Sequence, residues 1–340
     1  MPSEALDVQY FVRLALSAGA VALLPACGGG SVAPSSASLN GTYEYVGRTL
    51  SVNGRLVTAA RPPNLSPLPR YATILPDRRA SKTFEYIFNE YGAGIFDYPK
   101  SDSQIGTLTG AGGQGCTNVL YGYGKKIFWD VVSETAITEY KVLDKPIKTL
   151  SESVGLPTSC AMNTGGDLAV GILYGAYGGA VDIFKNASGS GTVITTPLDE
   201  EFFDGYDNKG NLFADGFNSS GLFALVELPK GSSTFRTITT SNTVEFPGSV
   251  QWDGKYLTVF DQAANAMYRY TVSGATATLQ GTVSFTSTDC AQTWIVQGLL
   301  YCADAGNNDA EVFKYPAGGS PTAVLTGNLY FPFGVVAVRK

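Results

Sequence analysis

The chain repeats a segment of about forty-four residues six times. Each repeat carries the same β-prone phrases separated by short turns, as in Glu311 to Gly318 (EVFKYPAG) followed by Ala323 to Gly327 (AVLTG). The expected starts of the first strand are spaced by 44, 44, 45, 41 and 45 residues: Cys116, Cys160, Asp204, Ser249, Cys290 and Val335. Periods of forty to fifty residues that hold four short strands are typical of β-propeller blades. The sequence therefore predicts an all-β protein built from four-stranded blades.

The two ends of the repeat region complement each other. The first repeat, from Phe84 to Gly110, supplies strands two to four but no first strand, whereas Phe333 to Val338 (FGVVAV) has the pattern of a first strand with nothing after it. We therefore predict that the C-terminal strand pairs with the N-terminal blade and closes a six-bladed ring over residues 84–340. Closure removes the free sheet edges through which chains associate, so we expect a monomer.

The N-terminus resembles a bacterial lipoprotein signal. The apolar run from Leu14 to Ala26 follows Arg13, is too short to span a membrane, and ends at Cys27 after a small residue. The resemblance implies that residues 1–26 are a signal peptide, that Cys27 is lipidated, and that the protein is exported and anchored to the cell envelope on its periplasmic or cell-surface side. A buried strand with an incidental cysteine is the alternative. Residues 27–38 are rich in Gly, Ser and Ala and are expected to be a flexible tether.

Residues 39–80 follow a different pattern from the repeats. The phrases TYEYVG from Thr42 and RLVTA from Arg55 are β-prone, and Val52-Asn53-Gly54 between them is a turn signal, so we expect a hairpin. The proline-rich stretch from Arg61 to Arg70 then predicts an extended connector to the propeller.

Composition removes several classes of function. The formal net charge of −6 argues against nucleic acid as a partner, because binding to phosphate backbones depends on clustered Lys and Arg. The sequence contains no histidine, which excludes Ser-His-Asp and Cys-His nucleophilic machinery and histidine-ligated metals.

Four cysteines follow Cys27, and disulfides are plausible in an exported chain. Cys116 and Cys160 hold equivalent positions in neighbouring blades, so we expect a bridge between them. Cys290 and Cys302 would form the second bridge, but a turn at Gln297-Gly298 places Cys290 opposite position 305, so that pairing needs a bulge. Four buried thiols are the alternative.

Carboxylates recur at the end of the second strand. Five of the six repeats carry one there, Gly171 being the exception: Glu90, Asp130, Asp215, Asp261 and Asp304. These ends should lie on the same face as the starts of the first strands, where Asp204 and Asp289 belong, so one rim is expected to be acidic. Such a rim could hold Ca²⁺ or Mg²⁺, or attract a cationic ligand. Alternatively the carboxylates cap the turns that follow, because Asn218, Asn265 and Asn307 come shortly after three of them.

Aromatic residues mark the two repeats that depart most from the pattern. Trp129 replaces the usual residue in the second repeat, and the third contains the longer phrase GILYGAYGG with Tyr174 and Tyr177. These side chains are candidate platforms for a sugar or a peptide, or else they pack between blades.

Two phrases carry a family resemblance: Gly205 to Gly216 (GYDNKGNLFADG) and Tyr301 to Asn307 (YCADAGN). They resemble the blades of NHL-repeat six-bladed propellers, and residues 84–340 are similar to uncharacterised exported bacterial proteins of this kind. The resemblance implies the fold. It also implies two possible activities, because some members bind proteins or nucleic acid, whereas a gluconolactonase-like branch hydrolyses lactones with a divalent cation held by Glu, Asn and Asp.

We favour a membrane-anchored, non-enzymatic binding or scaffold propeller for a protein, peptide or glycan, since residues of catalytic types are scarce and the repeat is well kept. No resident cofactor is expected under this hypothesis. The alternative is a divalent-cation-dependent hydrolase that uses Ca²⁺ at the acidic rim, which requires a free carboxylate to act as a base.

Overall fold

The computed structural model describes residues 44–46, 49–52, 55–58, 82–89, 92–109, 113–131, 136–142, 146–151, 155–175, 178–286 and 289–340. It divides the chain into two compact units, Met1–Pro67 and Leu68–Lys340. The predicted signal peptide, Cys27, the tether and the proline-rich connector lie outside the described residues. In the first unit, β1 (Glu44–Val46), β2 (Thr49–Val52) and β3 (Arg55–Thr58) form an antiparallel sheet in that order. The two expected strands correspond to β1 and β3, but they do not pair with each other, because β2, which was not predicted, lies between them.

The second unit is all-β, and its first sheet joins both of its ends. The sheet order is β27 (Gly334–Arg339), β4 (Thr83–Asn89), β5 (Gly92–Asp97) and β6 (Ser101–Thr109). β27 pairs antiparallel with β4 from Gly334↔Phe88 to Arg339↔Thr83. The C-terminal strand therefore completes the N-terminal sheet, as the sequence predicted.

Three further sheets have four antiparallel strands each, in sequence order. The second sheet contains β7 (Gly115–Thr117), β8 (Lys126–Val131), β9 (Ala136–Lys141) and β10 (Pro146–Ser151). The third contains β11 (Gly155–Met162), β12 (Leu168–Gly175), β13 (Gly178–Phe184) and β14 (Thr192–Thr195). The last contains β23 (Cys290–Val296), β24 (Leu299–Asp304), β25 (Asp309–Lys314) and β26 (Ala323–Leu325).

The remaining strands form one eight-stranded sheet where the sequence predicted two blades. One half contains β15 (Glu200–Tyr206), β16 (Leu212–Phe217), β17 (Phe223–Leu228) and β18 (Arg236–Thr240). The other contains β22 (Thr276–Ser284), β21 (Ala266–Ser273), β20 (Leu257–Asp261) and β19 (Val250–Trp252). The halves meet where the outer strands β18 and β22 run parallel through Thr239↔Thr276 and Thr240↔Ala277. Their order is otherwise that of the four-stranded sheets.

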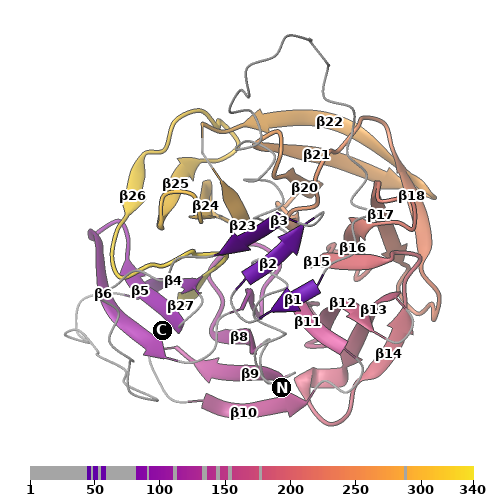
Figure 1. Ribbon diagram of the computed structural model, residues 1–340, viewed down its shortest axis with the longest axis horizontal. Helices are drawn as coiled ribbons and strands as arrows, with labels where there is room; N and C mark the ends of the chain where they lie inside the picture. Colours follow the sequence, from indigo (N-terminus) through magenta and orange to yellow (C-terminus); the bar gives the residue numbers. More distant parts are fainter. Residues whose placement is uncertain are drawn as a thin grey trace. The chain divides into compact units, whose positions relative to one another are not determined.

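Figure 1 shows the sheets of the second unit around a common centre, with the fourth strands β6, β10, β14, β18, β22 and β26 on the outside. This is a β-propeller-like arrangement of four-stranded blades. Among the described residues, no helix has the length and apolar character needed to cross a membrane.

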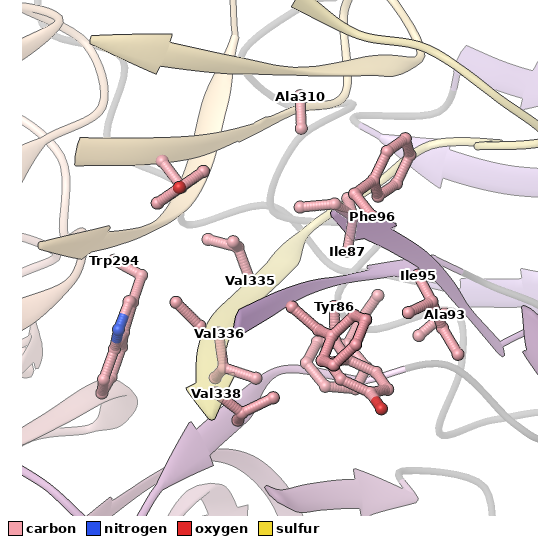
Figure 2. Packing of buried hydrophobic residues seen from close by; sticks show 14 of the residues in the cluster. Tyr86, Ile87, Ala93, Ile95, Phe96, Trp294, Ala310, Val335, Val336 and Val338 are labelled. Atoms are coloured by element: carbon pink, nitrogen blue, oxygen red, sulfur yellow. The ribbon is translucent and has the colours of Figure 1, made fainter. Parts of the chain in front are cut away.

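The core near the ring closure is built from the strand that closes it. Val335, Val336 and Val338 of β27 are fully buried. Figure 2 shows them beside Tyr86 and Ile87 of β4, with Trp294 on the other side. Both faces of β27 are therefore packed, as expected for a strand inside a ring and not at an edge.

Two disulfides join inner strands. One links Cys116 of β7 to Cys160 of β11 in the neighbouring sheet, with a Cα–Cα distance of 5.6 Å. The other links Cys290 of β23 to Cys302 of β24. The pairing of these two strands shifts register between Cys290 and Thr293, which is the bulge that the second bridge requires.

Candidate functional site

The loop between β7 and β8, residues 118–125, crosses one end of the ring; we call it the plug loop. The Trp294 indole N–H donates to Gly122 O at 3.2 Å, and Gln251 Nε2 donates to Leu120 O at 3.2 Å. Gly124 N of the same loop donates to Ala337 O of β27 at 3.1 Å. The plug loop thus contacts β19, β23 and β27 and lies over this end of the centre. Its sequence signal is its length, since the corresponding turns in other repeats, such as 253–256, are shorter.

Behind the plug loop lies a central cavity of about 40 Å³. Its walls come from the first strands and include Ser159, Asp204, Gln251, Gln292, Thr293 and Trp294. A water molecule needs roughly 10–15 Å³ of such space, so the cavity holds a few waters. It is too small for an organic substrate in this conformation.

Two carboxyl groups meet beside this cavity. The Ser159 hydroxyl lies 3.1 Å from Asp204 Oδ2 and 3.3 Å from Glu201 Oε1, and the Thr158 hydroxyl donates to Glu201 Oε2 at 3.0 Å. Burial raises the pKa of Asp204 to about 7. Burial and the charge of Asp204 raise the pKa of Glu201 well above its usual range. At neutral pH the pair therefore holds at least one proton.

Glu201 also explains the interruption of the carboxylate repeat. A side chain at Gly171 would overlap the Glu201 carboxylate and the Ser159 hydroxyl. Glu201 comes from the next sheet and occupies the space that a side chain at 171 would need. The missing carboxylate at 171 is visible in the sequence, whereas the role of Glu201 in its place is not.

The recurring carboxylates hold backbone amides. Asp261 Oδ2 accepts from Glu245 N at 2.8 Å, and its Oδ1 accepts from Ala263 N at 3.1 Å. Asp304 Oδ1 accepts from Asn307 N at 3.0 Å. Asp261 and Asp304 are fully buried. These contacts favour the turn-capping interpretation, and Asp261 additionally fixes the segment that leads into β19.

Asp215 differs from that interpretation. It lies inside β16, and its Oδ2 accepts from Gly248 N of the next repeat at 3.3 Å. The turn after β16 is instead capped by Asn218 Oδ1, which accepts from Ser220 N at 2.9 Å. The expectation that Asp215 caps its own turn is therefore wrong, because the carboxylate points across to the neighbouring repeat.

The acidic rim contains carboxylates that are less buried. Asp199 and Glu245 are exposed, while Glu200, Asp289 and Asp309 are half-buried. Burial and the charge of Asp304 raise the pKa of Asp309 to about 6. Burial and the charge of Asp199 raise the pKa of Glu200. Among the residues that the structure describes, no three His, Cys, Asp or Glu side chains form a metal-binding group.

The other predicted site residues fall wholly or partly outside the described part of the chain. Glu90 and Tyr177 lie outside the described residues. Trp129 and Asp130 are positions on β8 and Tyr174 is a position on β12, but their side chains are outside the described part of the chain. Their proposed role as ligand platforms stays a prediction.

A second cavity, which we call the lateral pocket, has a volume of about 160 Å³ and opens between the turns that follow β15 and β19. Phe213, Leu257 and Tyr270 form apolar walls, Trp252 is half-buried in it, and Lys209 and Lys255 border it. These aromatic residues were not among the candidates predicted from the sequence. Repeated Asp-containing turns are the signal that could have located the pocket.

Both of these turns are held by an aspartate. Asp207 Oδ1 accepts from Lys209 N at 2.8 Å, and Asp253 Oδ1 accepts from Lys255 N at 2.8 Å. Asp253 Oδ2 also pairs with Arg269 Nε at 2.7 Å. These carboxylates are buried and satisfied, so the ammonium groups of Lys209 and Lys255 remain the exposed charges.

Comparison with known proteins supports the fold. No protein-family model and no curated protein matches the sequence. A chain in the crystal structure of a nidogen/laminin complex is similar with a TM-score of 0.59 at 13% identity, covering 75% of this chain and 98% of that chain. The structure of apo AztD from Citrobacter koseri has a TM-score of 0.45 at 12% identity, covering 76% and 98% of the two chains. Since identity is so low, the nidogen/laminin match indicates a shared fold and no shared activity.

Proposed function

We propose that this chain is a six-bladed, NHL-like propeller that acts as a lipid-anchored, non-enzymatic binding or scaffold protein. The blade count is supported by the eight-stranded sheet, because its halves touch through only two residue pairs and each half repeats the strand order of a four-stranded sheet. The NHL-like assignment rests on the phrases Gly205 to Gly216 and Tyr301 to Asn307.

The observation that carries the binding role is the small volume of the central cavity. The plug loop covers one end, the cavity behind it measures about 40 Å³, and the buried carboxylates Asp261 and Asp304 are used on backbone amides. Recognition by such a molecule takes place on its outer surfaces. We propose that the acidic rim, with Asp199 and Glu245 exposed, receives a cationic segment of a protein or peptide partner.

A titration with a short cationic peptide tests this role. Oligolysine binding is expected to weaken with rising salt, and also below about pH 6, where Asp309 takes up a proton. Glu245→Gln should weaken binding several-fold, whereas Asp102→Asn, an equal charge change at an exposed site in β6, should not. Equal effects of the two substitutions, or no binding at low salt, would contradict the proposal.

A divalent-cation-dependent hydrolase is the second candidate. It is favoured by Asp204, whose Oδ1 is buried without a hydrogen-bond partner beside the central cavity. Such an activity would require the plug loop to open and a cation such as Ca²⁺ to bind near Asp204 and Glu201.

Anchoring is tested separately in cells. Metabolic labelling with a fatty acid is expected to mark the protein, and Cys27→Ser is expected to remove the label and release the protein from the membrane fraction. Membrane association that survives Cys27→Ser without the label would contradict a lipid anchor.

A further inference from the structure

The plug loop identifies one face of the second unit. Tyr121 Oη accepts from Gly298 N at 3.0 Å, and Leu120 packs against the cluster that contains Ala161 and Tyr206. The ends of β11, β15, β23 and β27 therefore lie on the side of the plug loop, together with the turns that follow the first strands. We call this side the turn face. The acidic rim is at the opposite ends of the same strands, because the first strands start there.

The ends of the third strands are tied to the turn face by hydrogen bonds. Asn186 N donates to Asp167 Oδ1 at 3.1 Å, and Lys230 N donates to Asn211 Oδ1 at 3.0 Å. Tyr315 N donates to Gly298 O at 2.8 Å. Residues that adjoin these contacts belong to the turn face as well.

The turn face is basic. Its turns carry three exposed lysines, and the ends of its third strands carry three more: Lys125, Lys209, Lys255, Lys185, Lys230 and Lys314. None of the six forms an ion pair with a described carboxylate. Asp207 and Asp253, which lie in the same turns, are buried and used internally. The net charge of −6 therefore conceals a separation of charge between the turn face and the acidic rim.

Three further cationic residues lie at the turn-face ends of β4 and β27. β4 starts at Thr83, which pairs with Arg339 at the end of β27, and Lys340 N donates to Lys82 O at 2.8 Å. Lys82, Arg339 and Lys340 are exposed and add positive charge.

We propose that the turn face docks on the anionic phospholipid headgroups of the membrane that carries the anchor. Clustered Lys and Arg are attracted to anionic lipid surfaces, and a basic surface beside a lipid chain strengthens attachment. Trp252, half-buried in the lateral pocket between Lys209 and Lys255, suits the headgroup region, where Trp is favoured. Docking in this way leaves the acidic rim directed away from the membrane. The inference rests on the proposed anchoring for the choice of a membrane over other anionic surfaces.

Vesicle binding of the full chain carrying Cys27→Ser tests the docking without a lipid anchor. Co-sedimentation is expected to be stronger with phosphatidylglycerol-containing vesicles than with phosphatidylcholine vesicles, and the difference should shrink as salt rises above about 0.1 M. Lys125→Ala, Lys209→Ala and Lys255→Ala together should reduce the affinity for anionic vesicles by at least about tenfold. The apolar run 14–26 is the same in every variant and both vesicle types, so the difference reports the turn face.

The matched control places the same change of net charge on the opposite side. Ser219→Glu, Ser220→Glu and Thr243→Glu, at exposed positions beside the acidic rim, should leave vesicle binding within about twofold, as expected for charges screened beyond a Debye length. Thermal melts establish that both triple variants are folded. Equal binding to the two vesicle types, or full binding by the lysine variant, would overturn the inference. Binding to soluble polygalacturonate without binding to vesicles would overturn it too, and would make the turn face a site for acidic glycans.

Failure of the docking and failure of the anchor are distinguishable. The vesicle assay contains no lipidated cysteine, and the apolar run 14–26 is common to all variants, so the differences between variants and between vesicle types depend on the turn face. The cellular assay of Cys27→Ser reports the anchor whatever the turn face does.

Discussion

Val336→Ala tests whether the C-terminal strand closes the ring. Val336 is fully buried between β4 and the neighbouring sheet. Removing its two methyl groups loses about 0.8 kcal/mol of transfer free energy per carbon and leaves a cavity, so we expect a loss of about 2–3 kcal/mol in the free energy of unfolding. At about 2–4 °C per kcal/mol, the Tm should fall by about 5–10 °C.

The control is Val324→Ala in β26. This valine makes the same change of side chain at a position that is 37% exposed, so its effect should stay within about 0.5 kcal/mol. Denaturant unfolding followed by near-ultraviolet circular dichroism and tryptophan fluorescence measures both variants. Equal losses of stability in the two variants would refute the reasoning. They would mean that Val336 is no more buried than Val324, as for a C-terminal strand left at a free edge.

Deleting residues 334–340 extends the same argument. The deletion removes three fully buried valines, Val335, Val336 and Val338. At about 1.5–3 kcal/mol each, their burial amounts to roughly 5–9 kcal/mol, which is on the scale of the whole stability of a typical domain. The truncated chain is expected to lose cooperative unfolding, and a folded, monomeric truncation would contradict ring closure.

Three other predictions concern the centre. Gly171→Ala should lower the free energy of unfolding by about 1–3 kcal/mol, because the new methyl group meets Glu201. Gly281→Ala, in open space on β22, should be close to neutral. Equal thermal melts of the two variants would contradict this packing. Burial raises the pKa of Asp204 to about 7, above its unfolded value, so this group contributes stability at low pH that is lost as pH rises through about 7. Asp204→Asn should therefore flatten that part of the plot of unfolding free energy against pH. An unchanged plot would contradict the assignment. Chelation should leave the Tm of the binding protein unchanged, and a loss restored by Ca²⁺ would favour the hydrolase.

Much of the chain's organisation follows from local sequence. The forty-four-residue spacing predicted the starts of the inner strands at Cys116, Cys160, Asp204, Ser249, Cys290 and Val335, and each lies in or beside the observed strand. The turn expected at Gln297-Gly298 separates β23 from β24. These features are accessible because a strand and its turn are specified by residues close together in the chain.

The pairing of β27 with β4 was also predictable, although its partners are far apart in sequence. The first repeat lacks a first strand, and the C-terminal segment consists of a first strand alone, so the two segments together make one complete blade. The joining of β18 to β22 was not predictable, because outer strands of neighbouring blades touch only when the twist of both sheets brings them together.

The candidate sites depended on tertiary structure. Nothing near Gly171 in the sequence indicates that Glu201, from the next sheet, fills its space. The sequence of the plug loop does not indicate its contacts with Gln251 and Trp294, which lie more than a hundred residues away. Long-range contacts of this kind depend on loop path and side-chain packing, which periodicity does not encode.

The sequence by itself determined the repeat, the order of the strands, the closure of the ring and the overall negative charge, because each is a property of composition or of short-range pattern. Only the tertiary structure decided where the charges act. Alternating strands carry the lysines of the turns to one face and leave the less buried carboxylates at the other, whereas the central carboxyl groups are withdrawn from water. The two faces acquire opposite charge only when the chain is folded, because burial neutralises some charged groups or pairs them with hydrogen-bond donors and leaves others exposed to water.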